Sequence, residues 1–113
     1  MRGEEKAIRL RIYLGESDQH GKRPLYQHLL EYFRQKGLAG CTVIRALSGF
    51  GHSSRLHTLD VLRLSSDLPV VLEVVDKAEK VDPLLPSLRE WVRGGLITRE
   101  EVHILHYTGV RKG

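Results

Sequence analysis

The sequence predicts a single α+β domain in which two helices cover one face of a four-stranded antiparallel sheet. Residues 6–14 alternate between apolar and polar side chains, residues 68–76 are apolar on both faces, and segments with helical spacing at 24–36 and 77–93 separate the strand-like segments. The length of 113 residues suits one domain, 1–113, with one modest hydrophobic core.

The first strand is expected over residues 6–14, "KAIRLRIYL". Four apolar side chains fall on one face of this strand: Ile8, Leu10, Ile12 and Leu14. The opposite face carries Arg9, Arg11 and Tyr13. Such alternation is typical of a strand with one buried face. The following "GESDQHGKR" has the composition of a loop.

The first helix is expected over residues 24–36. Proline suits the first position of a helix and glycine the position after its end, which matches Pro24 and Gly37. An apolar stripe near helical spacing joins the two ends: Leu25, Tyr26, Leu29, Leu30, Tyr32 and Phe33.

The second strand is expected over residues 41–47, and a loop of about 48–68 follows it. Within that loop, "TLDVLRL" fits either a strand or a short helical piece. The next segment, "LPVVLEVVD", is the strongest strand in the chain. Strands that are apolar on both faces are usually central and covered on both sides.

The second helix is expected over about 77–93, either kinked or starting late near residue 82. Pro83 and Pro86 each remove a backbone donor from its early part, and the glycines at 94–95 end it. Asp76 is predicted to cap the helix. "VHILHY" at 102–107 is the predicted last strand, and residues 108–113 form a basic tail.

The resulting order, βαββαβ, is the ferredoxin-like pattern. One face of its sheet has no helices, and Tyr13, Val71 and Val75 are expected on it. Monomers rarely leave large apolar patches exposed, so we infer that an oligomer buries this face. The alternative is a single-layer sheet with scattered exposed valines.

Composition narrows the functional classes. The net charge of +4 and pI near 9.5 come from basic residues spread along the chain, which does not favour nucleic-acid binding. A single cysteine, Cys41, excludes an internal disulfide and any multi-cysteine zinc site, and suits a reducing compartment. The N-terminal residues lack the apolar core of a secretory signal, so we expect a cytoplasmic protein.

Two motifs at their spacing carry a family resemblance: Gly40-Cys41-Thr42-Val43, and Gly49-Phe50-Gly51 at the start of the long loop. With "LPVVLEVVD" and "GLITREEVHILHY", they make residues 7–107 resemble the family called domain of unknown function 190, which is similar to the nitrogen regulatory PII signal proteins. The resemblance implies a ferredoxin-like fold and a homotrimer whose sheets face inward. It also implies signalling by small effectors, often adenine nucleotides such as ATP, ADP or AMP, bound between subunits. The loop would then engage or release a membrane transporter or an enzyme.

The sequence departs from PII proteins in three places. PII proteins hold phosphates on a glycine-rich turn after the third strand, whereas "VVDKAEKVDPLL" has no glycine there. No tyrosine lies between residues 48 and 67, so the nucleotidylation of some PII loops is not expected. The family usually has Arg-Gly before its loop, but this chain has Arg45-Ala46, and alanine does not adopt a positive φ cheaply.

The predicted ligand-binding residues lie at the start of the long loop and in the tail. Glycines permit close backbone approach, a guanidinium suits phosphate or carboxylate, and Phe50 could stack on a base. The candidates are Arg45, Gly49, Phe50, Gly51, His52, Arg55, Arg111 and Lys112. The structural alternative is that the glycines relax a loop entry, Phe50 packs beneath it, and the tail is a solvated terminus.

Catalysis and metal binding have little support. Ser53 and Ser54 adjoin His52, but no orienting carboxylate is placed beside them, so we expect no enzyme. Two histidines five residues apart, His52 and His57, define no metal geometry. The alternative function is a trimeric scaffold that binds a protein partner or a divalent metal without nucleotide, as CutA-like trimers are proposed to do.

Overall fold

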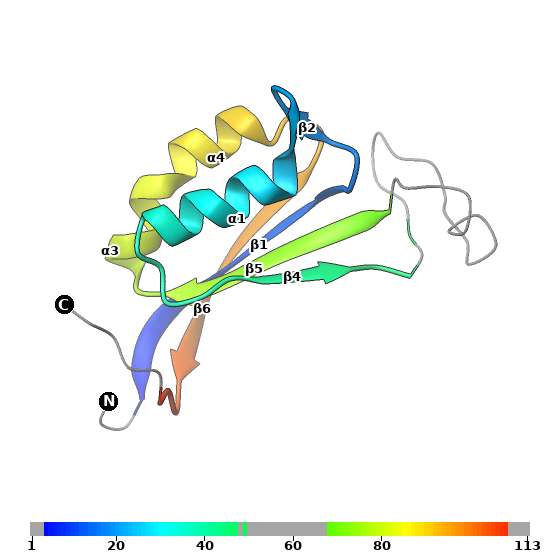
Figure 1. Ribbon diagram of the computed structural model, residues 1–113. Coiled ribbons are helices and arrows are strands. Elements are labelled where there is room, and N and C mark those ends of the chain that lie inside the picture. The colour runs from blue at the N-terminus through cyan, green and yellow to red at the C-terminus, as the bar shows by residue number, and fades with distance from the viewer. Residues whose placement is uncertain (1–3, 48, 50–67, 109–113) are drawn as a thin grey trace.

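Two central strands, β1 (Glu5–Gly15) and β5 (Pro69–Asp76), pair antiparallel and form the middle of the sheet. Strand β4 (Thr42–Arg45) flanks β5, and β6 (Leu96–Ile104) flanks β1, which gives the order β4-β5-β1-β6. All helices lie on one face of this sheet (Figure 1). The predicted ferredoxin-like fold is therefore confirmed.

The computed structural model describes residues 4–47, 49 and 68–108. The predicted strand or helical piece in "TLDVLRL" lies outside these residues.

The core lies between the central strands and the helices. Both strands turn every second side chain toward the helical layer, as the alternation predicts. The buried strand residues are Ile8, Leu10, Ile12, Leu14, Val70, Leu72 and Val74. The helices contribute Leu25, Leu29, Phe33, Val81, Leu84, Leu88 and Val92. Leu30 of the predicted stripe is instead exposed, because it lies on the outer side of its helix.

Helix α1 (Leu25–Gln35) begins one residue later than expected. Pro24 precedes it with an extended backbone, φ −57° and ψ 134°. At the other end Gly37 has φ +76°, while its N–H bonds to Arg34 O and the Leu38 N–H bonds to Phe33 O. This is a Schellman ending, which needs a residue that tolerates positive φ, so the prediction for Gly37 is confirmed.

The second helical segment is a broken run, as the prolines predict. It comprises α3 (Ala78–Val81), the 3₁₀ turn η1 (Asp82–Leu84) and α4 (Leu85–Trp91). Pro83 and Pro86 lie in the first positions of the two later pieces, where a missing backbone donor costs least.

The predicted cap at Asp76 is wrong. Lys77 is the N-cap of α3 and makes no side-chain cap. Asp76 ends β5, is 4% exposed, and accepts hydrogen bonds from the N–H groups of Ala39 at 2.9 Å and Lys77 at 2.8 Å. The carboxylate thus joins the α1–β4 connection to the end of β5.

Two strands and one loop also differ from the predictions. Strand β6 spans Leu96–Ile104 rather than 102–107, because its charged first half pairs with β1, including Glu100 opposite Arg9. Strand β4 is shorter than the predicted 41–47. The predicted loop after β1 contains a small hairpin of β2 (Gln19–His20) and β3 (Arg23–Pro24), turned at Gly21 with φ +62°.

Candidate functional site

The face of the sheet away from the helices is the first candidate surface. Directly paired residues on neighbouring strands share a face, so the register places Arg9, Arg11 and Tyr13 beside Val75, Glu73 and Val71. This confirms the predicted position of these side chains. We refer to this surface as the uncovered face.

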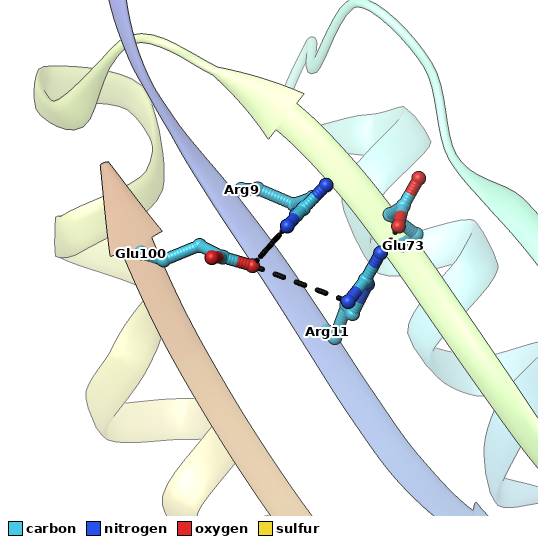
Figure 2. A network of polar contacts seen from close by, with 4 residues as sticks. All are labelled: Arg9, Arg11, Glu73 and Glu100. Carbon is cyan, nitrogen blue, oxygen red and sulfur yellow. Dashed lines mark hydrogen bonds and ion pairs between the residues drawn. The ribbon is translucent and has the colours of Figure 1, made fainter. Parts of the chain in front are cut away.

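A network of four charged side chains lies at its centre (Figure 2). Arg11 Nε donates to Glu73 Oε2 at 2.7 Å, and Arg9 Nε donates to Glu100 Oε1 at 2.8 Å. Arg11 Nη1 also lies 4.0 Å from Glu100 Oε1. The hydrogen bond to Glu73 raises the pKa of Arg11 further, so this guanidinium remains charged throughout the accessible pH range.

An apolar row crosses all four strands beside this network. The register pairs Ile44 with Val71, Val71 with Tyr13, and Tyr13 with Leu96. Ile44 is 50% exposed, Tyr13 36% and Leu96 56%. A continuous apolar row of this kind is typical of a surface that another molecule covers.

A cavity of about 500 Å³ opens at the other end of the uncovered face. Its apolar lining includes Val75 and Ile104, and its polar lining includes Thr42, Glu73 and Lys77. Volumes of roughly 300–1,000 Å³ are usual for small-molecule sites. Tyr107 and His106, just beyond the end of β6, also line it.

The cavity is assembled from parts of the chain that are distant in sequence. Asp76 holds Ala39 against the end of β5, which brings Gly40, Cys41 and Thr42 to the cavity wall. On the opposite side, Lys77 Nζ lies 3.8 Å from Glu5 Oε1 at the beginning of β1. The hydrogen bonds that the Asp76 carboxylate accepts from backbone N–H groups therefore help to shape this site.

Cys41 in the cavity wall gives a direct chemical probe of it. Burial raises the pKa of its thiol to about 11, and the thiolate is the reactive form. Two pKa units lower the thiolate fraction about a hundredfold at pH 8. We expect Ellman's reagent to react about a hundredfold more slowly with native protein than with protein in urea. Equal rates in both conditions would contradict the burial of this thiol.

The second candidate surface lies where the chain enters and leaves residues 50–67. Glu16 N–H bonds to Leu68 O at 2.7 Å, and Ala46 N–H bonds to Pro69 O at 2.8 Å. The Arg45 guanidinium pairs with Glu16 Oε1 at 3.2 Å. These contacts fix the two ends of the segment to the edge of the sheet.

The structure describes two of the predicted ligand-binding residues. Arg45 is exposed and already paired with Glu16, as above. Gly49 has φ +155°, and a side chain there would meet Pro69 Cγ at 3.3 Å, so a glycine suits this position. Ala46 does not adopt a positive φ, since no described non-glycine residue does. The remaining predicted residues lie outside the described part of the chain: Phe50, Gly51, His52, Arg55, Arg111 and Lys112.

Sequence reasoning missed the cavity as a site. One wall of the cavity could have been found from the sequence, because Gly40, Cys41 and Thr42 also carry the family resemblance. The other walls combine the start of β1 with the ends of β5 and β6, which no local pattern relates.

Among residues 4–47, 49 and 68–108, no three or more His, Cys, Asp or Glu side chains are grouped so as to hold a metal ion. None of the helices in these ranges is long and apolar enough to cross a membrane.

The fold resembles that of a solved PII-like protein. The chain superposes on CPII, a nitrogen regulatory PII-like protein from Thiomonas intermedia bound to ADP, AMP and bicarbonate, with a TM-score of 0.70. The identity is 16%, and the match covers 91% of this chain and 92% of that one. The apo form of CPII gives a TM-score of 0.62 at 16% identity, covering 92% and 97%. The fold is therefore that of PII-like proteins.

Relatives in sequence extend over most of the chain. A UPF0166 protein of Aquifex aeolicus is 36% identical over 86% of this chain and 91% of its own length. The UPF0166 protein of Methanocaldococcus jannaschii is 35% identical over 88% and 92%. The model of the DUF190 family, described as "Uncharacterized ACR", matches residues 7–104. This protein therefore belongs to the DUF190 family.

Proposed function

We propose that the protein is a PII-like regulator. It forms a homotrimer, binds an adenine nucleotide between subunits, and controls a partner protein through the segment after β4. The observation that carries this proposal is the cavity of about 500 Å³ on the uncovered face. The cavity and the apolar row lie on the same face of the sheet, so a second copy that covered this whole face would cover both.

The side chains around the cavity suit a nucleotide. Val75 and Ile104 offer apolar contact to a base, and Tyr107 offers an aromatic face. The Thr42 hydroxyl suits a sugar, and the Lys77 ammonium suits a phosphate. Lys77 occupies the junction where PII proteins have their glycine-rich turn, so here a side chain would replace backbone N–H groups as the phosphate ligand.

The fixed ends of the 50–67 segment support control of a partner. Glu16 holds both Leu68 and Arg45 through its backbone and its side chain. A ligand can bias such a segment only if it binds one arrangement more tightly than the other. Ordering of a segment by ligand is an established mode of switching. CPII with bound ADP and AMP supports the choice of adenine nucleotides for the first test.

Isothermal titration calorimetry with ATP, ADP and AMP, each with and without magnesium and bicarbonate, tests the proposal. We expect at least one nucleotide to bind, and Lys77→Ala to weaken it about ten- to a hundredfold, since hydrogen bonds to charged groups contribute about 1.5–3 kcal/mol. Arg89→Ala, an exposed cation on α4 outside the cavity, is the matched control and should leave the affinity unchanged. Absence of binding to all three nucleotides would refute the nucleotide proposal. Equal losses in both variants would refute the assignment to this cavity.

A further inference from the structure

A cluster of aromatic side chains fastens the β2–β3 hairpin to the helices. The imidazoles of His20 on β2 and His28 on α1 stack at 3.9 Å between centroids, with planes inclined by 19°. Trp91 at the end of α4 contacts both edge-on, at 4.4 Å from His28 and 5.5 Å from His20. Tyr32 of α1 also contacts Trp91, with 4.8 Å between the two ring centroids.

The stacking excludes shared metal binding by the two histidines. A metal bound to imidazole lies in the plane of the ring, about 2.1 Å from the nitrogen. Two stacked rings inclined by only 19° have planes that intersect far beyond that distance. Any role of the two histidines as a pair therefore depends on protonation or on packing, and not on a shared metal ion.

His28 is placed where a charge is unfavourable. Its Nε2 atom is buried and has no hydrogen-bond partner among the described residues. Burial lowers the pKa of His28, and the nearby His20 and Arg23 lower it further. The neutral ring suits this environment, because it can stack on His20 and receive the edge of Trp91 without losing hydration of a charge.

His20 borders a second cavity, of about 480 Å³, between the β2–β3 hairpin and the end of α4. Its charged lining comprises Asp18 before the hairpin, and Glu90 and Arg93 at the end of α4. The His20 ring therefore has space to turn into this cavity when its stacking on His28 is lost.

We propose that His20 and His28 form a pH-sensitive clasp, which holds the β2–β3 hairpin on α1 and α4 while the His28 imidazole is neutral and releases it when His28 is protonated. The clasp joins three elements, because its rings come from β2 and α1 and are braced by Trp91 of α4. It does not depend on nucleotide binding, since none of its residues lines the cavity on the uncovered face.

The charged and titratable surroundings favour release in acid. The hairpin and its approach contribute Asp18 and Arg23, α1 contributes Glu31 and Tyr32, and α4 contributes Glu90 and Arg93. Glu31 is paired with Arg34, and the nearest cation, Arg23, opposes a charge on His28. A histidine with a lowered pKa contributes stability that is present above its ordinary value of about 6.5 and is lost as the pH falls below it.

Hydrogen exchange of the hairpin amides between pH 7.5 and pH 5, corrected for the intrinsic exchange rate, tests the clasp. We expect the open population to rise as the pH falls through the ordinary histidine pKa of about 6.5, and by no more than about thirtyfold at pH 5. Emission of Trp91, the sole tryptophan, should change over the same pH range. His28→Phe keeps an aromatic ring that cannot be protonated, so the increase in acid should be smaller in this variant than in the unmodified protein.

His20→Phe provides a second variant in case His28→Phe does not fold, and it should also reduce the increase. His103→Gln, an exposed histidine on β6, is the control and should respond like the unmodified protein. Hairpin protection that is the same at pH 7.5 and pH 5 in the unmodified protein would overturn the clasp. An undiminished pH response in the folded phenylalanine variants would overturn it as well.

Discussion

Tyr13→Asp is expected to dissociate the proposed homotrimer into folded protomers and to abolish the proposed binding of nucleotide. Tyr13 lies on a central strand, so any copy that covers the uncovered face must bury residue 13. An aspartate there would face Val71 and Leu96, while the nearest guanidinium, Arg11, is already bonded to Glu73. A buried charge without a partner costs about 3–5 kcal/mol, and the trimer would contain three.

Light scattering after size exclusion measures this result. The unmodified chain should elute at about three times 12.9 kDa and the variant at 12.9 kDa. The protomer should remain folded, because Tyr13 is 36% exposed even without a partner. Leu30→Asp is the matched control, since Leu30 has similar exposure, 38%, but lies on α1. A variant at residue 13 that remains trimeric would show that the trimer is built on another surface.

The uncovered face illustrates what could be predicted from the sequence. Alternation in β1 and β5 places Tyr13, Val71 and Val75 opposite the core, and the structure confirms this, because the period of a strand fixes the face of each side chain. The charge network of Figure 2 could not be predicted in the same way. It depends on the register between β1 and β6, whose first half has no apolar alternation, and this is also why the start of β6 was placed too late.

The cavity and the clasp could not be predicted from local sequence patterns, for a different reason. Their residues come from segments that are far apart in the chain, such as His20, His28 and Trp91. Each segment was correctly assigned as loop, helix or helix end, apart from the short hairpin. Local periodicity does not say which side chains meet when helices pack, so neither the aromatic cluster nor the cavity walls could be derived from it.

Asp76→Ala is expected to lower both stability and the proposed nucleotide affinity, because this carboxylate joins two connections at the wall of the cavity. It is 4% exposed and accepts hydrogen bonds from Ala39 and Lys77, which belong to different connections. Removing an acceptor from buried donors costs about 1–3 kcal/mol. The same change frees Ala39 and therefore the cavity wall formed by Cys41 and Thr42.

Urea denaturation measures the stability lost with Asp76. Hydrogen exchange of the Ala39 amide measures whether the cavity wall is released. Asp76→Asn keeps one acceptor oxygen, so its stability loss should be about half that of Asp76→Ala. Asp82→Asn is the control: Asp82 is an exposed carboxylate paired with Arg99 outside the cavity, and we expect a smaller loss and an unchanged nucleotide affinity. If the Ala39 amide stays protected in Asp76→Ala, the α1–β4 connection is held by other contacts, and this carboxylate does not shape the site.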